Sequence, residues 1–360
     1  MKKNNFTSTK SYIGLFIFAL LSLGLYTSCN SATEKTEEIS EETSVHEHER
    51  EAELLEKSHL FFQSSVTALI DTDIPQEKVE LGKKLFFDTR LSLDGNISCN
   101  SCHNLETHGV DNLPLSPGDT DEFGGRNSPT VLYAFLHGMQ FWDGRAKDVE
   151  EQAGGPILNP VEHNIPNAEF LEERLRGVEE YQEMFGRVYK DSAEAITFAT
   201  ITDAIGAFER QLAPVSRFDE WMDGKTDALT KEEKDGLALF FDNQCTTCHN
   251  GPALGGRMLQ KFGLYGDYWV HTKSEKIDLG RYEETKEERD KHFFKVPGLR
   301  NVAETYPYFH DGSVEKLEDA IRIMGELQIQ DDLTEEEVQS ITTFLKSLTG
   351  ELDEDLKRMN

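Results

Sequence analysis

Apolar residues recur at helical spacing in several separate stretches of the chain. Two such stretches, 168–188 and 193–212, lie in the middle of the sequence. A third, 334–348, opens on Thr334 with Glu337 one turn later, which fits a capping box. Strand-like alternation is sparse, so the pattern predicts a mainly α protein with long loops between its helices.

A short amphipathic pattern occurs twice, at 82–88 and at 236–242. Both copies begin with glycine and end in Leu-Phe-Phe-Asp, which predicts two helices with a similar apolar face. Each copy leads into a Cys-x-x-Cys-His sequence, eleven residues after the aspartate in the first copy and three in the second. Duplication on this scale predicts two tandem domains, since a solenoid needs short periods and several copies.

The two Cys-x-x-Cys-His sequences, at 99–103 and 245–249, have the attachment pattern of c-type haem. In that pattern each thiol adds to a vinyl group of the haem, and the histidine binds the iron. A zinc ribbon has its cysteine pairs about 15–20 residues apart, whereas these pairs are 146 residues apart. A redox dithiol does not need the adjacent histidine. We therefore predict two cytochrome c-type domains with two covalently bound haem c groups, held by Cys99, Cys102, His103, Cys245, Cys248 and His249.

The N-terminus resembles an export signal. Lysines precede an apolar run at 12–26 that is too short for a membrane span and suits a secretory signal. The run leads into Cys29 through a loose bacterial lipobox, in which Tyr26 stands where a small aliphatic residue is usual. We interpret 1–29 as a lipoprotein-type signal with Cys29 lipidated; an ordinary cleaved signal is the alternative. Both predict export to the periplasm or cell envelope, and the first predicts a lipid anchor on a membrane surface.

Residues 30–58 hold ten glutamates, three basic residues and no aromatic side chain. Such a segment cannot bury enough apolar surface to offset its ordering entropy, so we predict an acidic flexible tether. A Pro-Val-Ser sequence at 214–216 then divides an N-terminal domain, 59–215, from a C-terminal domain, 216–360. The formal net charge is −30, of which −26 falls on residues 59–360. This charge argues against a nucleic-acid partner and favours a basic protein.

The second haem iron needs a ligand on its open side. Met324 lies 75 residues after His249 and just before the last predicted helix, where a cytochrome c domain supplies a methionine. Met258 lies only nine residues after His249, which is too short a segment to wrap around the haem. We therefore predict Met324 as the ligand. Because His/Met ligation raises the reduction potential, this haem would accept and store electrons.

Further motifs, taken together, resemble the bacterial dihaem cytochrome c peroxidase family over nearly all of residues 75–350. They are Leu-Gly-Lys-Lys-Leu-Phe-Phe-Asp (81–88), Gly-Arg-Asn-Ser-Pro-Thr-Val (125–131), Phe-Trp-Asp-Gly-Arg-Ala (141–146), Gly-Pro-Ile-Leu-Asn-Pro-Val-Glu (155–162), Val-Pro-Gly-Leu-Arg-Asn-Val (296–302), Pro-Tyr-Phe-His-Asp-Gly (307–312) and Leu-Glu-Asp-Ala-Ile-Arg-Ile-Met-Gly (317–325).

The resemblance implies that hydrogen peroxide is reduced to water at the N-terminal haem, on His103. Electrons would reach the C-terminal haem from a small basic cytochrome c or a copper protein and pass to the N-terminal one. The resemblance also implies Trp142 as an electron relay, Glu162 as the catalytic acid–base group and Gln152 as a group that orients peroxide. Ordinary core packing of Trp142 and a solvated loop position for Glu162 stay open.

The resemblance further implies one calcium ion near the domain interface, bound by oxygen ligands at Asn127, Thr305 and Pro307. Asp119 departs from the family, because many members have a histidine there as distal ligand of the peroxidatic haem. A loop aspartate is better solvated outside the haem pocket. We therefore expect a first iron that is five-coordinate or holds water and reacts with peroxide without prior reduction. His163 stays open as another ligand or as a surface residue.

Two other function classes compete. A dihaem oxidase of a protein or peptide substrate resembles this chain but carries a tyrosine ligand at its second haem, where we expect Met324. A non-enzymatic dihaem electron carrier needs neither Glu162 nor an open first iron. The sequence leaves open the physiological donor and whether the chain forms a homodimer.

Overall fold

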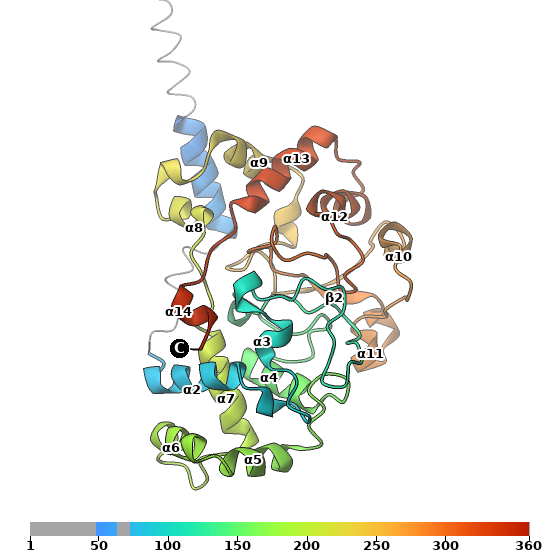
Figure 1. Cartoon of the computed structure of the whole chain (residues 1–360). Coiled ribbons are helices and arrows are strands. Elements are labelled where there is room, and N and C mark those ends of the chain that lie inside the picture. Colours follow the sequence, from blue (N-terminus) through green and yellow to red (C-terminus); the bar gives the residue numbers. More distant parts are fainter. Residues whose placement is uncertain (1–47, 63–72, 360) are drawn as a thin grey trace, which may run out of the picture. The chain divides into compact units, whose positions relative to one another are not determined.

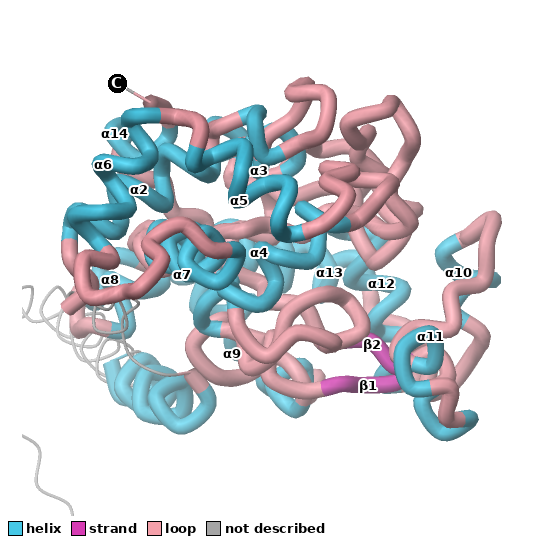
Figure 2. Tube along the Cα trace, turned by 90° about the horizontal axis from the view of Figure 1, so that it is seen from below, coloured by secondary structure: helices cyan, strands magenta, loops and turns pink. Residues whose placement is uncertain are grey.

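The computed structural model describes residues 48–62 and 73–359. Its mainly α character confirms the prediction, and Figure 2 shows short helices joined by long loops. The α-helices of residues 73–359 are α2 (Gln76–Phe86), α3 (Cys99–Cys102), α4 (Val149–Leu158), α5 (Ala168–Arg176), α6 (Glu179–Val188), α7 (Phe198–Glu209), α8 (Arg217–Met222), α9 (Lys231–Asp242), α10 (Tyr268–Thr272), α11 (Tyr282–Thr285), α12 (Leu317–Met324), α13 (Glu335–Lys346) and α14 (Glu354–Lys357). Shorter 3₁₀ turns and one π segment lie at Thr89–Leu91, Leu105–Thr107, Ala134–Leu136, Thr226–Ala228, Cys245–Thr247, Glu288–Asp290 and Gly325–Ile329.

In the first half of the chain, α2 packs against α7, and the two helices lie together in Figure 1. Gly82 of α2 permits this approach, because a Cβ there would lie 1.8 Å from the backbone oxygen of Ala204 in α7. Phe86 and Phe208 are fully buried beside the contact, with ring centroids 5.4 Å apart. The glycine that begins the repeated sequence pattern is therefore a packing residue.

The second half repeats this arrangement with α9 and α13. A Cβ on Gly236 of α9 would lie 2.1 Å from the backbone oxygen of Ser340 in α13. Phe240 and Phe344 pack across the pair, with ring centroids 5.5 Å apart. The duplication predicted from the sequence is thus visible as two helix pairs, each with its own hydrophobic core.

The predicted helices are present with shorter bounds. The stretch 168–188 forms two helices, α5 and α6, with a break after Arg176. Only the centre of 193–212 is helical, because a capping box at Thr197 starts α7 there. α13 opens on the capping box predicted from the sequence.

The segment before the first half packs on the core of the second half. A helix over residues 48–61 leads to Phe62, which is buried beside Phe218 and Phe241. Leu54 and Leu55 of this helix contact the same core. Residues 48–58 are therefore helical, in place of the flexible tether predicted there, because leucines interrupt the glutamates and provide an apolar face. The rest of the predicted tether and the signal segment with Cys29 lie outside the described residues.

The C-terminal segment crosses in the other direction. Leu352, just after α13, is buried in the core of the first half, and Leu356 packs on it. The described residues from Glu53 onward form one compact unit. The two halves therefore exchange their ends. The domain boundaries predicted at 59 and 216 divide the chain linearly and do not describe this exchange.

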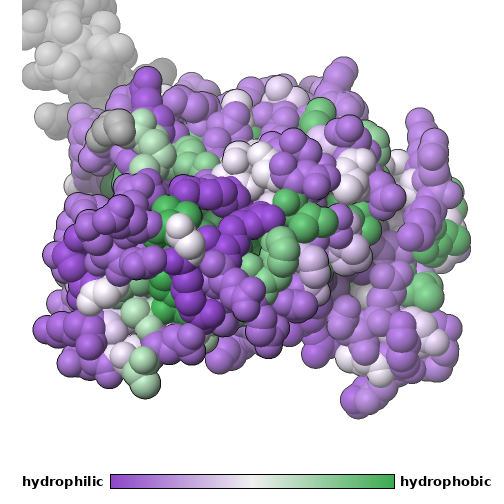
Figure 3. Space-filling view, turned by 60° about the horizontal axis from the view of Figure 1, so that its bottom comes forward, coloured by the Kyte–Doolittle hydropathy of each residue, from purple (hydrophilic) through white to green (hydrophobic). Residues whose placement is uncertain are grey.

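A small antiparallel sheet lies in the second half, where β1 (Leu259–Lys261) pairs with β2 (Phe293–Lys295). Beside it, a third hydrophobic cluster is built from Phe262, Tyr268, Phe294 and Leu327; we call it the aromatic cluster. Within the described ranges, no helix combines the length and the apolar character that crossing a membrane requires. The face drawn in Figure 3 is mostly hydrophilic, in keeping with the acidic composition.

Candidate active site

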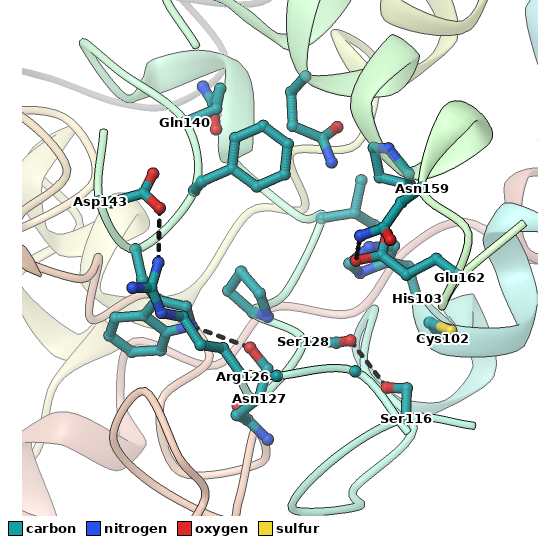
Figure 4. A pocket seen from close by; sticks show the side chains of 18 of the residues that line it. Cys102, His103, Ser116, Arg126, Asn127, Ser128, Gln140, Asp143, Asn159 and Glu162 are labelled. Carbon is teal, nitrogen blue, oxygen red and sulfur yellow. Dashed lines mark hydrogen bonds and ion pairs between the residues drawn. The ribbon is translucent and has the colours of Figure 1, made fainter. Parts of the chain in front are cut away.

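The first Cys-x-x-Cys-His sequence forms a single helical turn, α3, which opens on a capping box between Ser98 and Ser101. Cys99 and Cys102 of this turn are free thiols. A cavity of about 440 Å³ lies beside the turn and is lined by both thiols and by His103. Figure 4 shows this cavity with Cys102 and His103 on one of its sides.

His103 has the chemical character of an iron ligand. Its Nδ1 atom is buried and has no hydrogen-bond partner among the residues that the structure describes. Burial lowers the pKa of His103, so the imidazole is neutral and keeps a lone pair for a metal. Two free thiols, a neutral imidazole and an adjacent cavity together fit a covalently attached haem.

Glu162 and Gln152 border the same cavity, so the structure brings both predicted pocket residues together with the first haem motif. The Oε1 atom of Glu162 accepts a hydrogen bond of 2.9 Å from Asn159 Nδ2, which Figure 4 shows beside His103. Burial raises the pKa of Glu162, although the charge of Arg145 and the Asn159 hydrogen bond act in the opposite direction. Glu162 is therefore a partly buried cavity residue and not a solvated loop acid.

Asp119 is buried, whereas we expected it in solvent. Its carboxylate accepts hydrogen bonds from the backbone N–H groups of Asp94, at 2.6 Å, and Asn96, at 3.1 Å. Burial raises the pKa of Asp119, but these bonds and that of Ser92 outweigh it, so the net pKa is lowered. The carboxylate thus fixes the loop that leads into α3.

His163 is also buried, which corrects the surface position considered for it. Its Nδ1 atom lies 3.0 Å from the backbone oxygen of Leu91. Burial lowers the pKa of His163 to about 4, so the ring is neutral near pH 7. The backbone N–H of Asp119 donates a hydrogen bond to the backbone oxygen of Glu162. The backbone N–H of Leu93 donates one to the backbone oxygen of His163. Asp119 and the loop before α3 therefore hold the segment that carries Glu162.

Trp142 connects the two halves. Its Nε1 atom donates a hydrogen bond of 2.9 Å to the backbone oxygen of Asn127. Its own backbone oxygen accepts a hydrogen bond of 2.6 Å from the N–H of Lys295 in β2. The indole lines the cavity of the first motif and packs against the aromatic cluster, on which Met324 also packs.

The three predicted calcium residues share one small cavity. Asn127, Thr305 and Pro307 all line a space of about 90 Å³, together with Trp142. The Nδ2 atom of Asn127 donates to the backbone oxygen of Leu113 at 2.9 Å, which leaves the amide oxygen for another partner. The structure brings these residues together, and their ligation of calcium stays a prediction.

The second Cys-x-x-Cys-His sequence has Cys245 and Cys248 as free thiols. The Nδ1 atom of His249 lies 3.2 Å from the backbone oxygen of Leu254, an arrangement that leaves Nε2 for a metal. Burial lowers the pKa of His249 to about 4. Met324 ends α12 and packs on the aromatic cluster, so its role as ligand stays a prediction.

Comparison with known proteins identifies the family. A family model described as di-haem cytochrome c peroxidase matches residues 76–227. The chain is 46% identical to cytochrome c551 peroxidase from Nitrosomonas europaea over 276 residues, which cover 76% of this chain and 80% of that protein. It is 44% identical to cytochrome c551 peroxidase from Pseudomonas aeruginosa, over 79% of this chain and 82% of that one. The chain belongs to the dihaem cytochrome c peroxidase family.

The chain is therefore an oxidoreductase of the peroxidase type, and its family implies two haem c groups. The fold is also similar to the crystal structure of a MauG-like protein associated with microbial copper homeostasis, with a TM-score of 0.70 and 32% identity. That match covers 80% of this chain and 93% of the other. The resemblance inferred from the sequence motifs is confirmed.

Sequence reasoning missed an ion-pair cluster in the cavity wall of this family member. Arg126 forms ion pairs with Asp143 at 2.5 Å and with Asp278 at 2.6 Å. Arg126 and Asp143 lie inside two of the motifs named above, which is a signal that could have found them. Asp278 lies in an irregular loop of the second half, and the sequence around it carries no such signal.

Proposed function

We propose that this chain reduces hydrogen peroxide to two waters, with two electrons from a small donor protein and two protons. The observation that carries the proposal is the single cavity that holds the first Cys-x-x-Cys-His sequence together with the buried carboxyl of Glu162. Cys99 and Cys102 would hold a haem covalently, with His103 as iron ligand. Cys245, Cys248 and His249 would hold the second haem, so the two halves correspond to two haem domains.

When bound, the first haem supplies an iron that takes up peroxide and exchanges electrons. Glu162 would accept a proton from peroxide and return it to the oxygen that leaves as water. Its raised pKa brings it closer to neutral pH, where a group that both takes and gives a proton is most effective. Gln152 lines the same space and would orient peroxide by hydrogen bonding.

Electrons would enter at the second haem and reach the first through Trp142. The indole supports this role because it borders the first cavity and packs on the cluster that carries Met324. With Met324 and His249 as ligands, the second iron would have the higher potential and store an electron. A calcium ion at Asn127, Thr305 and Pro307 would stabilise the loops on either side of this path.

The donor would be a small basic cytochrome c or a copper protein. The charge of −26 on residues 59–360 supports a basic surface on the partner. Both proteins would meet in the periplasm or cell envelope, where the chain would be held by lipid on Cys29.

The test is peroxide consumption by the exported holoenzyme, followed through oxidation of a reduced basic cytochrome c. Turnover is expected, and its second-order rate should fall with salt, because the Debye length shortens from about 10 Å at 0.1 M to about 3 Å at 1 M. A dihaem oxidase of proteins or a simple electron carrier would not sustain turnover with peroxide and this donor. A rate that is flat in salt, or higher with an acidic donor, would refute the proposed charge steering.

A further inference from the structure

Lys295 is a buried lysine between the two halves. It ends β2 and is only 4% exposed. Among the residues described here, its Nζ atom has one hydrogen-bond partner, the Nδ1 atom of His137 at 3.0 Å. An ammonium has three protons to donate, so two of them have no acceptor of this chain within the described part.

His137 does not compensate the lysine charge. Burial and the charge of Lys295 lower the pKa of His137 well below its usual range, so the ring is neutral and accepts one proton of the ammonium. The ring is held rigidly: a Cβ on Gly256 would lie 2.2 Å from its Cδ2 atom, and one on Gly298 would lie 2.9 Å from its Nε2 atom. The ring therefore fixes the position of the Lys295 Nζ atom and adds no charge to that of the ammonium.

The nearby carboxylate, that of Asp143, is paired with two arginines and not with Lys295. Asp143 is the acidic group that raises the pKa of Lys295, but burial dominates and lowers that pKa to about 8. Asp143 forms ion pairs with Arg126 at 2.5 Å and with Arg145 at 2.7 Å. A buried ammonium without an anion is costly, so the protein alone leaves this site electrostatically incomplete.

The position of Lys295 indicates which anion could balance its positive charge. The residue lines the cavity of the first haem motif, and it also lines the smaller cavity beside Trp142. A haem carries two propionate carboxylates, and the larger cavity is the one that contains Cys99, Cys102 and His103.

We propose that Lys295, held in place by His137, is the counter-charge for a propionate of the haem bound at His103. This proposal rests on the haem attachment proposed above. A positive charge near the propionate favours the reduced iron, which carries one positive charge less than the oxidised iron. Lys295 would thus be a positioning residue that orients the first haem and raises its reduction potential, beside the relay residue Trp142.

The experiment is a redox titration of both haems in the holoenzyme of Lys295→Met. Both haems should remain attached, and the ratio of reduced to oxidised first haem at a fixed potential should fall by about tenfold, which for one electron is about 59 mV. Lys295→Arg keeps the charge and should stay close to the wild type. Lys78→Met removes a lysine of α2 that pairs with Asp203 at 2.7 Å and lines neither cavity, so it should shift nothing.

An unchanged potential in Lys295→Met would overturn the proposal, and so would equal falls in Lys295→Met and Lys295→Arg. A larger shift at the second haem would overturn the assignment to the first. Mass spectrometry of the wild type and of each variant counts the attached haems, which distinguishes a failure of the proposed function from a failure of this inference. A wild-type chain without two attached haems would refute the proposed function, whereas two attached haems with an indifferent Lys295 would refute this inference alone.

Discussion

The two halves of the molecule share one packing device and differ around their haem motifs. In each, a glycine of the repeated pattern lets one helix approach another, α2 on α7 and α9 on α13. The first motif borders a cavity of about 440 Å³, and Nδ1 of His103 has no partner within the described part. In the second, His249 is fixed by Leu254.

The difference begins in the segment between the helix and the haem motif. Cys99 lies eleven positions after Asp88, whereas Cys245 lies only three positions after Asp242. The longer segment contains the loop that Asp119 binds through Asp94 and Asn96, and this assembly forms the wall behind Glu162. Helix packing is thus common to both halves, whereas the extra loop holds the segment of Glu162, the acid–base group proposed for the first half alone.

Glu162→Gln should give the largest change in turnover. The amide keeps the size of the side chain and its contact with Asn159 but cannot accept the peroxide proton. General acid–base catalysis contributes about 10²–10⁴-fold, so turnover should fall by that factor. The measurement is steady-state peroxide consumption, with absorption spectra that show both haems intact.

The matched control for that change is Glu173→Gln, at an exposed position of α5. It should leave turnover unchanged. Near wild-type activity in Glu162→Gln would transfer the proton role to His163 or to water, and the contrast between the halves would then not depend on this carboxyl.

Met324→His should remove the high potential of the second haem. Both haems should stay attached, and the second potential should fall by more than about 59 mV, the shift of a tenfold change in a one-electron equilibrium. Turnover with a cytochrome donor should fall in consequence. The same titration on Met258→His is the control, and a shift there instead of in Met324→His would assign the ligand to Met258.

The resting state of the first iron tests the contrast directly. Because hydrogen bonds from the loop before α3 occupy the carboxylate of Asp119, it is not free to bind the iron. We therefore expect a high-spin ferric signal in electron paramagnetic resonance of the oxidised protein, and reaction with peroxide without prior reduction. A low-spin first haem would contradict this expectation and make His163 the first ligand to test.

The sequence predicted the mainly α fold, the duplication and the family, because these depend on short local patterns such as Cys-x-x-Cys-His and Gly-x-x-Leu-Phe-Phe-Asp. It did not predict that Phe62 packs in the core of the second half and Leu352 in the core of the first, since such contacts join segments that are distant in the sequence. Nor did it predict the burial of Asp119, whose partners are backbone N–H groups that any sequence supplies. Lys295 within Phe-Phe-Lys-Val was a readable signal, because a lysine inside an apolar run calls for a buried partner.

The smallest effect on turnover should come from the packing glycines, whose substitution tests whether the halves unfold separately. A Cβ on Gly82 or Gly236 would meet backbone oxygen, so Gly82→Ala and Gly236→Ala should each destabilise the protein by about 1–3 kcal/mol. Gly186→Ala is the control, because a Cβ there meets no atom within 4 Å, and it should be neutral or slightly stabilising. Urea unfolding followed by circular dichroism and haem absorbance provides the measurement.

Because Phe62 and Leu352 tie each core to the other half, both variants should lower one shared transition. Two transitions, each moved by only one variant, would show that the halves are independent and that the exchanged ends do not couple them.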